Sequence, residues 1–208
     1  MKTAYSFLLS LLIAGATVSA AEGEDFRPLF NGKDLSGWKL RNEAGTQSWS
    51  VIDGILKNTV GPGEHGTDLV TEEKFWNFTV RYEYMIPEGA NSGFYLRGRH
   101  EIQISDDFAS GKPTKNGNGS IYNHTAPSKF VSKKPGEWQT VEATMIGDKV
   151  TVILNGEKIH DNVTVERATG SEIDNKVNEP GPFFLQGDHG SVSFRNIHVK
   201  TLPKDARS

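Results

Sequence analysis

The chain has 208 residues, a net charge of −3 and no cysteine. It lacks the basic blocks of proteins that bind nucleic acid or anionic membrane surfaces, and without cysteine it forms no disulfides. Its 22 glycines and 9 prolines indicate a fold with many turns.

The N-terminus carries the pattern of a secretory signal peptide. Lys2 precedes an apolar run over residues 5–16, and small residues follow at 18–21. The run is too short to span a membrane. We therefore predict a signal peptide over residues 1–21, export to the periplasm or the medium of a bacterium, and no membrane contact after cleavage. Residues 22–208 are long enough for one domain with its own core.

The rest of the chain consists of short segments that alternate apolar and polar residues, separated by turn residues. The segments predicted as strands, in chain order, are 49–51, 55–57, 68–71, 75–86, 91–97, 101–107, 121–122, 138–146, 149–154, 158–160, 183–186 and 192–199, with tight turns at 53–54 and 155–156. Before them, Leu35, Trp38 and Leu40 are expected to face inward. Residues 108–119 and 162–181 read as long loops. No segment of helical length has apolar residues at i, i+3 and i+4. The pattern predicts an all-β sandwich or barrel of antiparallel strands.

The stretch 91–107 is predicted to form a hairpin. A three-residue loop over 98–100 would place Arg97 opposite Glu101 and Tyr95 opposite Gln103. Side chains alternate faces along a strand, so this register gives one apolar and one polar face.

The polar face of this hairpin carries Tyr95, Arg97, Glu101 and Gln103. An aromatic ring, a guanidinium, a carboxylate and an amide suit a polyhydroxylated ligand. The alternative is a solvated outer face with one Arg–Glu pair. In either case, an arginine opposite Glu101 would keep that carboxylate ionised.

Residues 101–106 also resemble the carboxylate motif of the laminarinase-like glucanases. Retaining hydrolysis needs two carboxyl groups about 5 Å apart. Glu101 could be one of them, but Asp106 would join its face only through a β-bulge. Gln103 replaces the motif's middle aspartate.

Two glycine-bounded turns carry further candidate side chains. Gln186, Asp188 and His189 lie in one of them, where His189 could serve as a general base or acid. His65 and Asp68 lie in or beside the other. This pair could ligate a metal, take part in catalysis or belong to a solvated loop.

Taken together, these segments resemble one family in an ordered series of motifs from Phe26 to Leu202. The motifs are 30–38 (FNGKDLSGW), 91–98 (NSGFYLRG), 101–104 (EIQI), 136–138 (GEW), 154–156 (LNG), 185–190 (LQGDHG) and 194–197 (FRNI). The series resembles the 3-keto-disaccharide hydrolase family, formerly a domain of unknown function, in the concanavalin A-like lectin/glucanase superfamily.

The resemblance implies a concanavalin A-like jelly roll of two antiparallel sheets, with a carbohydrate substrate on the concave sheet. It also implies cleavage of glycosides already oxidised at the sugar 3-position, by hydrolysis or by 1,2-elimination. Base removal of the C2 proton needs one base, one enolate stabiliser and one acid.

The residues offer candidates for each of these roles. We expect Glu101 or His189 as the base, and Arg97 or a divalent metal ion as the enolate stabiliser. His65 is a candidate acid or metal ligand. The remaining hydroxyl-binding candidates are Tyr95, Gln103, Gln186, Asp188 and Asp68. A retaining glucanase and a non-catalytic carbohydrate-binding module are the competing hypotheses.

Overall fold

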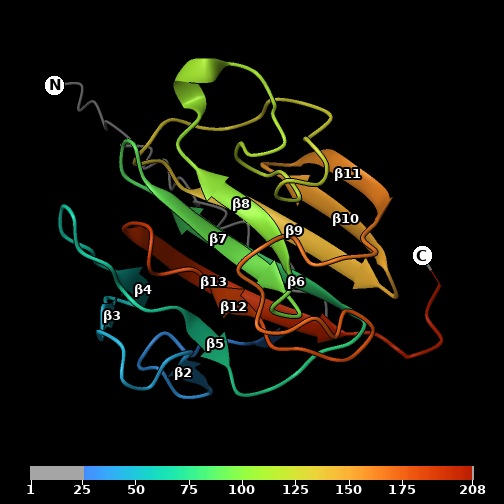
Figure 1. Ribbon diagram of the computed structural model, residues 1–208, viewed down its shortest axis with the longest axis horizontal. Helices are drawn as coiled ribbons and strands as arrows, with labels where there is room; N and C mark the ends of the chain where they lie inside the picture. Colours follow the sequence, from blue (N-terminus) through green and yellow to red (C-terminus); the bar gives the residue numbers. More distant parts are fainter. Residues whose placement is uncertain (1–25, 208) are drawn as a thin grey trace, which may run out of the picture.

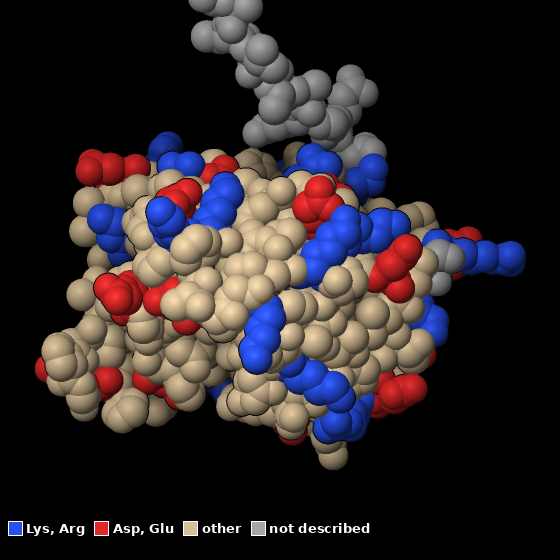
Figure 2. Space-filling model, turned by 90° about the horizontal axis from the view of Figure 1, so that it is seen from above, with Lys and Arg blue, Asp and Glu red and all other residues tan. Residues whose placement is uncertain are grey.

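The computed structural model describes residues 26–207 as two packed antiparallel sheets (Figure 1). The predicted signal peptide, residues 1–21, and the start of the predicted domain lie outside the described residues. Within 26–207, no helix is long and apolar enough to cross a membrane. Positive and negative side chains are interspersed on the face seen in Figure 2.

The larger sheet has eight strands in the order β11-β10-β9-β6-β13-β4-β3, with β1 paired to β13. Its strands are β1 (Arg27–Pro28), β3 (Trp49–Ile52), β4 (Ile55–Asn58), β6 (Phe78–Met85), β9 (Gln139–Ile146), β10 (Lys149–Leu154), β11 (Glu157–Thr164) and β13 (Val192–Thr201).

The smaller sheet has five strands in the order β2-β5-β12-β7-β8. Its strands are β2 (Trp38–Leu40), β5 (Leu69–Thr71), β7 (Asn91–Leu96), β8 (His100–Ser105) and β12 (Phe184–Leu185). A single 3-10 turn, η1 (Phe108–Ser110), lies in the long connection from β8 to β9, which arches over one end of the hairpin in Figure 1. The jelly-roll β-sandwich implied by the resemblance is confirmed.

Period-2 alternation accounts for the sandwich. In β6 the side chains of Phe78, Val80, Tyr82 and Tyr84 are buried, and the intervening residues point outward. The inward face of the smaller sheet meets them: Phe94 stacks on Tyr82 with ring centroids 4.0 Å apart. Burying each such ring stabilises the fold by about 1.5–3 kcal/mol.

Several predicted turns and loops are confirmed. Asp53-Gly54 and Asn155-Gly156 turn between paired strands, with positive φ at all four residues. The predicted loop at 162–181 is real, although β11 extends to Thr164. The expected strand at Ile121 is only an isolated bridge to Ile102.

The predicted register of the β7–β8 hairpin is wrong by two residues. The loop is Arg97–Arg99, so Leu96 faces His100, Tyr95 faces Glu101 and Gly93 faces Gln103. Arg97 and Gly98 have φ of 53° and 66°, and Leu96 O accepts the Arg99 N–H, as in a type I′ turn. A shift of two residues preserves the faces, so the predicted separation of polar and apolar side chains is correct.

Candidate active site

The outward face of the smaller sheet holds a small polar pocket of about 80 Å³. The side chains of Asn91, Tyr95, Glu101, Gln103, Gln186 and His189 line it, with Tyr122 and the Gly170–Ser171 turn at its rim. Strands β8, β7 and β12 lie side by side here: β7 and β8 supply Asn91, Tyr95, Glu101 and Gln103, and Gln186 directly follows β12.

Gly93 makes the room for this pocket. It lies on β7 between Gln103 of β8 and Gln186, which directly follows β12 and whose N–H donates to Gly93 O at 2.9 Å. A Cβ at Gly93 would lie 2.2 Å from Glu101 Oε1. The missing side chain therefore lets the Glu101 carboxylate extend across the strand.

Glu101 is a buried carboxyl group, with 3% of the residue exposed. Burial raises its pKa to about 7, while the hydrogen bond from Tyr95 and the nearby His189 act in the lowering direction. The Tyr95 hydroxyl donates to Glu101 Oε2 at 2.8 Å. A carboxyl group with a pKa near neutrality can take up and release a proton at physiological pH.

The Tyr95 ring is fixed by stacking. It lies on Phe184 with centroids 4.0 Å apart and an interplanar angle of 10°. The guanidinium of Arg41 lies 5.0 Å from the Phe184 ring centroid. Burial raises the pKa of the Tyr95 hydroxyl, so this group stays protonated and acts as a donor to Glu101.

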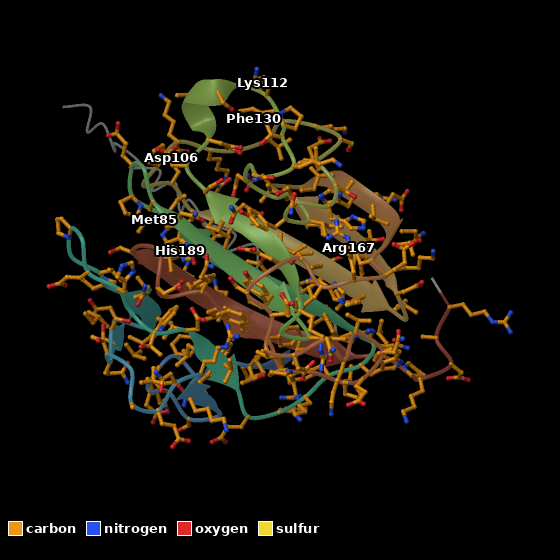
Figure 3. All side chains as sticks on the ribbon, in the orientation of Figure 1. Met85, Asp106, Lys112, Phe130, Arg167 and His189 are labelled. Atoms are coloured by element: carbon orange, nitrogen blue, oxygen red, sulfur yellow. The ribbon has the colours of Figure 1, made fainter. Side chains whose placement is uncertain are left out.

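The loop between β12 and β13 brings His189 to the pocket (Figure 3). His189 Nδ1 lies 2.5 Å from Asp188 Oδ1. This contact sets Nδ1 as the protonated nitrogen and leaves Nε2 for a ligand. The pairing resembles a carboxylate that orients a catalytic imidazole.

His65 and Asp68 contact the backbone of this loop. His65 Nδ1 contacts Asp188 O at 3.0 Å. Asp68 accepts the Gly187 N–H at 3.0 Å and lies 3.2 Å from Arg41 Nη1. Burial raises the pKa of Asp68. Neither side chain lines the pocket, so the structure gives both a supporting position.

The structure separates Arg97 from the other candidates. Its guanidinium stacks over Trp76 at 3.6 Å, and its Nε donates to Trp76 O at 2.8 Å. The predicted pairing with Glu101 is therefore wrong, since Tyr95 occupies the opposing position. The expectation of a carboxylate held ionised by arginine is also wrong, because burial raises the pKa of Glu101.

Asp106 does not join Glu101 either. Strand β8 has no bulge, so residue 106 does not return to the face of residues 101 and 103. Asp106 Oδ2 accepts the Gly89 N–H at 2.9 Å, and the side chain lines a different hollow with Phe108 and Lys134. Figure 3 labels Asp106 beyond the end of β8. The two-carboxylate arrangement of a retaining glucanase is absent at this pair.

Several site residues were missed by the sequence reasoning. Tyr122 lies in the short segment 121–122 and Ser171 in the loop 162–181, where no local pattern marks a binding residue; Ser171 adopts a positive φ of 51°. Asn91 could have been found, because it shares the outward face of β7 with Gly93 and Tyr95. Arg41 donates to the carbonyls of Ser171 and Glu172, both at 2.8 Å, which no local pattern reveals.

A larger hollow of about 450 Å³ lies on the outward face of the larger sheet. Its charged side chains are already paired: Arg81 with Glu142 and Arg195 with Glu83, each at 2.7 Å. The smaller pocket, with a buried carboxyl group and an imidazole, is the better candidate for chemistry.

Residues 25–200 match the sequence profile of the 3-keto-alpha-glucoside-1,2-lyase-like domain. The chain belongs to this family. The match covers both the β7–β8 hairpin and the β12–β13 loop, so the whole pocket lies within the family domain.

Two similar proteins carry names that describe activity on glycosides. The chain is 26% identical to a 3-keto-disaccharide hydrolase from Bacteroides thetaiotaomicron, over 87% of this chain and 80% of that protein. A crystal structure from Parabacteroides distasonis described as a "putative glycosyl hydrolase" is 30% identical, with a TM-score of 0.69 over 86% of this chain and 84% of the other.

A more distant structure bears on the fold alone. A laminarinase from Flavobacterium sp. UMI-01 is 13% identical, with a TM-score of 0.54 over 85% of this chain and 98% of the other. This likeness extends the jelly-roll sandwich to a distant protein.

A divalent metal ion, the alternative to Arg97 as enolate stabiliser, has no ligand cluster among the described residues. In the range 26–207, no three or more His, Asp or Glu side chains are grouped to hold an ion. Near the pocket, Asp188 is bound to His189 and Asp68 to Gly187 and Arg41. Because these carboxylates are already bound to other groups of the protein, the donor set does not fit a metal ion.

Proposed function

We propose that this protein cleaves 3-keto-glycosides in the pocket on the outward face of the smaller sheet, with Glu101 as the base. One observation carries the proposal: Glu101 is a buried carboxyl group of pKa about 7, bound to Tyr95 and sharing its pocket with His189. A site with one such carboxyl group suits proton abstraction better than hydrolysis by two carboxyl groups.

The reaction follows from the acidity of the substrate. A carbonyl at C3 acidifies the C2 proton, which the Glu101 carboxylate removes. The C2–H electron pair forms the C2–C3 double bond of an enolate, and the C3 oxygen takes the charge. When the carbonyl re-forms, the C1–C2 double bond forms and the C1–O bond breaks, releasing the aglycone oxygen, which takes up a proton. Addition of water across C1 and C2 completes net hydrolysis.

His189 is suited to the second proton transfer. Asp188 accepts from Nδ1–H and so orients the imidazole; in the imidazolium form, which carries a proton on both nitrogens, Nε2–H can donate to the enolate oxygen or to the departing aglycone oxygen. The reverse assignment, with His189 as the base and Glu101 as the acid, uses the same pair. Arg97 is withdrawn from the mechanism, because its guanidinium is held by Trp76.

An assay with paired glycosides tests the proposal. The protein should release aglycone from a p-nitrophenyl 3-keto-glucoside and not from the unoxidised glucoside. Deuterium at C2 should slow the reaction, since that C–H bond breaks. Equal cleavage of both sugars would contradict the proposal. Binding of both without turnover would support a carbohydrate-binding module instead.

The variant Glu101→Gln is the matched test of the base. We expect kcat to fall by about 10²–10⁴-fold. The melting temperature of this variant serves as the control for folding, and the direction of its change with pH can be stated in advance. A carboxyl group with a folded pKa of about 7, above the ordinary 4.5, destabilises the fold as pH rises between these values. Glu101→Gln should therefore melt at or above the wild-type temperature at pH 8, with the difference vanishing near pH 4.

A further inference from the structure

Two amide oxygens in the pocket are buried without a hydrogen-bond partner. They are Asn91 Oδ1 and Gln186 Oε1. Only 5% of Gln186 is exposed. Both side chains line the same pocket as Glu101 and His189.

The backbones of both residues are held in place. Gln186 N donates to Gly93 O at 2.9 Å, and Gln186 O accepts the Ser92 hydroxyl at 2.8 Å. Asn91 pairs with Ser105 at the start of β7. The backbones from which the two side chains extend are therefore fixed, while the amide oxygens remain unpaired.

Gln103 provides a contrast within the same pocket. Its Nε2 donates to Asn116 O at 3.3 Å, and its Oε1 accepts the Ile104 N–H at 3.1 Å. Both ends of this amide are occupied by the protein. A buried acceptor without a partner is costly, and a ligand that donates to it recovers that cost.

We propose that Asn91 and Gln186 accept hydrogen bonds from two hydroxyl groups of the sugar ring, and so select and orient the substrate. This inference rests on the proposed function, in which the ring occupies the pocket. The ligand is a sugar that keeps free hydroxyl groups beside its oxidised carbon. A ketone carries no proton to donate, so neither acceptor binds the C3 carbonyl oxygen, and each selects a hydroxyl group instead.

With this proposal, the residues that bind sugar hydroxyl groups differ from those expected from the sequence. Gln186 keeps the role expected from the sequence, Asn91 joins it, and Gln103 becomes a side chain that supports the pocket wall through Asn116 and Ile104. Specificity then comes from unpaired acceptors, because a ligand without the matching hydroxyl leaves them buried and unpaired.

The test combines two variants with deoxy substrates. Gln186→Met and Asn91→Leu keep the side-chain size and remove the acceptor. The probes are p-nitrophenyl 3-keto-glucoside and its 2-deoxy and 4-deoxy forms. We expect kcat/KM for the parent glycoside to fall about 5–50-fold in each variant. On the deoxy substrate that lacks the hydroxyl group bound by the substituted residue, the variant and the wild type should have the same kcat/KM.

Matched controls separate this effect from general damage. Gln47→Met and Asn178→Leu make the same changes at exposed positions away from the pocket and should keep wild-type kinetics. Removing an unpaired buried acceptor should not lower the melting temperature. Equal losses on the parent and on both deoxy substrates would overturn the inference, as would wild-type kinetics in both variants.

Calorimetry with the same glycosides separates this inference from the proposed function. If the wild-type protein binds them without turnover, the proposed reaction is wrong. Weaker binding by Gln186→Met and Asn91→Leu would still support the hydroxyl-binding pair, and unchanged binding would overturn it. Absence of wild-type binding overturns both.

Discussion

Burial and the Tyr95 hydroxyl act on Glu101 in opposite directions. Burial favours the neutral acid, and the hydrogen bond from Tyr95 stabilises the carboxylate. Burial is the larger effect, so the pKa lies at about 7. The sequence indicated Glu101 as the important carboxyl group. It could not predict this pKa, because Gln186 and Ser171, which share the pocket with Glu101, come from distant segments.

The balance at Glu101 predicts the pH dependence of activity. If the carboxylate is the base, kcat/KM should rise with pH through about 7. Tyr95→Phe removes the bond that lowers this pKa, so the rise should move to higher pH by about 0.5–1 unit. A pH–rate profile of the free enzyme measures the shift.

Tyr84→Phe is the control for this prediction. Tyr84 is also buried and donates to a side chain, Asn118, but lies outside the pocket. Its pH profile should match that of the wild type. A Tyr95→Phe profile that is unmoved, or moved to lower pH, would remove Tyr95 from the control of Glu101.

At the scale of the element, the β7–β8 hairpin decides which side chains meet. Alternation predicted its faces correctly, because a shift of two residues leaves every side chain on the same side. Loops over 97–99 and 98–100 both satisfy the pattern. The observed choice follows from contacts outside the hairpin, since the Trp76 ring and carbonyl hold Arg97 in the turn. Local sequence does not contain this information.

Gly93 is the position in β7 where a small change should have a large effect. Its φ is not in the left-handed region, so Gly93→Ala carries no backbone strain and should fold normally. The new Cβ would lie 2.2 Å from Glu101 Oε1 and would displace the carboxylate. We expect kcat to fall about 10–10³-fold, because misplacing a base by about 1 Å can cost 10²-fold.

Two measurements on Gly93→Ala check this explanation. The melting temperature should stay within a few degrees of wild type, since alanine suits a strand no worse than glycine. A crystal structure of the variant should locate the Glu101 carboxylate away from Tyr95. Activity within twofold of wild type would mean that the space over Gly93 is not needed.

At the scale of the whole molecule, the site is assembled from segments far apart in the chain. The fold class was predictable, because alternation is local and the family motifs run through the domain. The contacts that complete the pocket were not predictable, because they join residues such as Arg41 and Ser171, which are 130 residues apart in the chain. Arg99 anchors the same loop: its Nε donates to Asp174 at 2.6 Å.

Arg41 connects three parts of the pocket. Its guanidinium donates to Ser171 O and Glu172 O, contacts Asp68 and lies over Phe184. These contacts fix the 170–172 turn, the β12–β13 loop through Asp68, and the stack that holds Tyr95. Arg41→Met should therefore lower kcat/KM about 10–100-fold without unfolding the sandwich. Arg41→Lys should recover only part of the loss, because an ammonium lacks the planar fork that reaches two carbonyls.

Arg27→Met is the matched control for Arg41. Arg27 also pairs with a carboxylate, Glu73, and lies 5.8 Å from the Phe75 ring centroid, but both partners of the ion pair are about half exposed. Exposed pairs contribute little, so this variant should keep full activity. Hydrogen exchange gives a second readout: amides at 171–173 should exchange faster in Arg41→Met and not in Arg27→Met. If Arg41→Met kept both its activity and its protection, the turn would be held by the Arg99–Asp174 anchor alone.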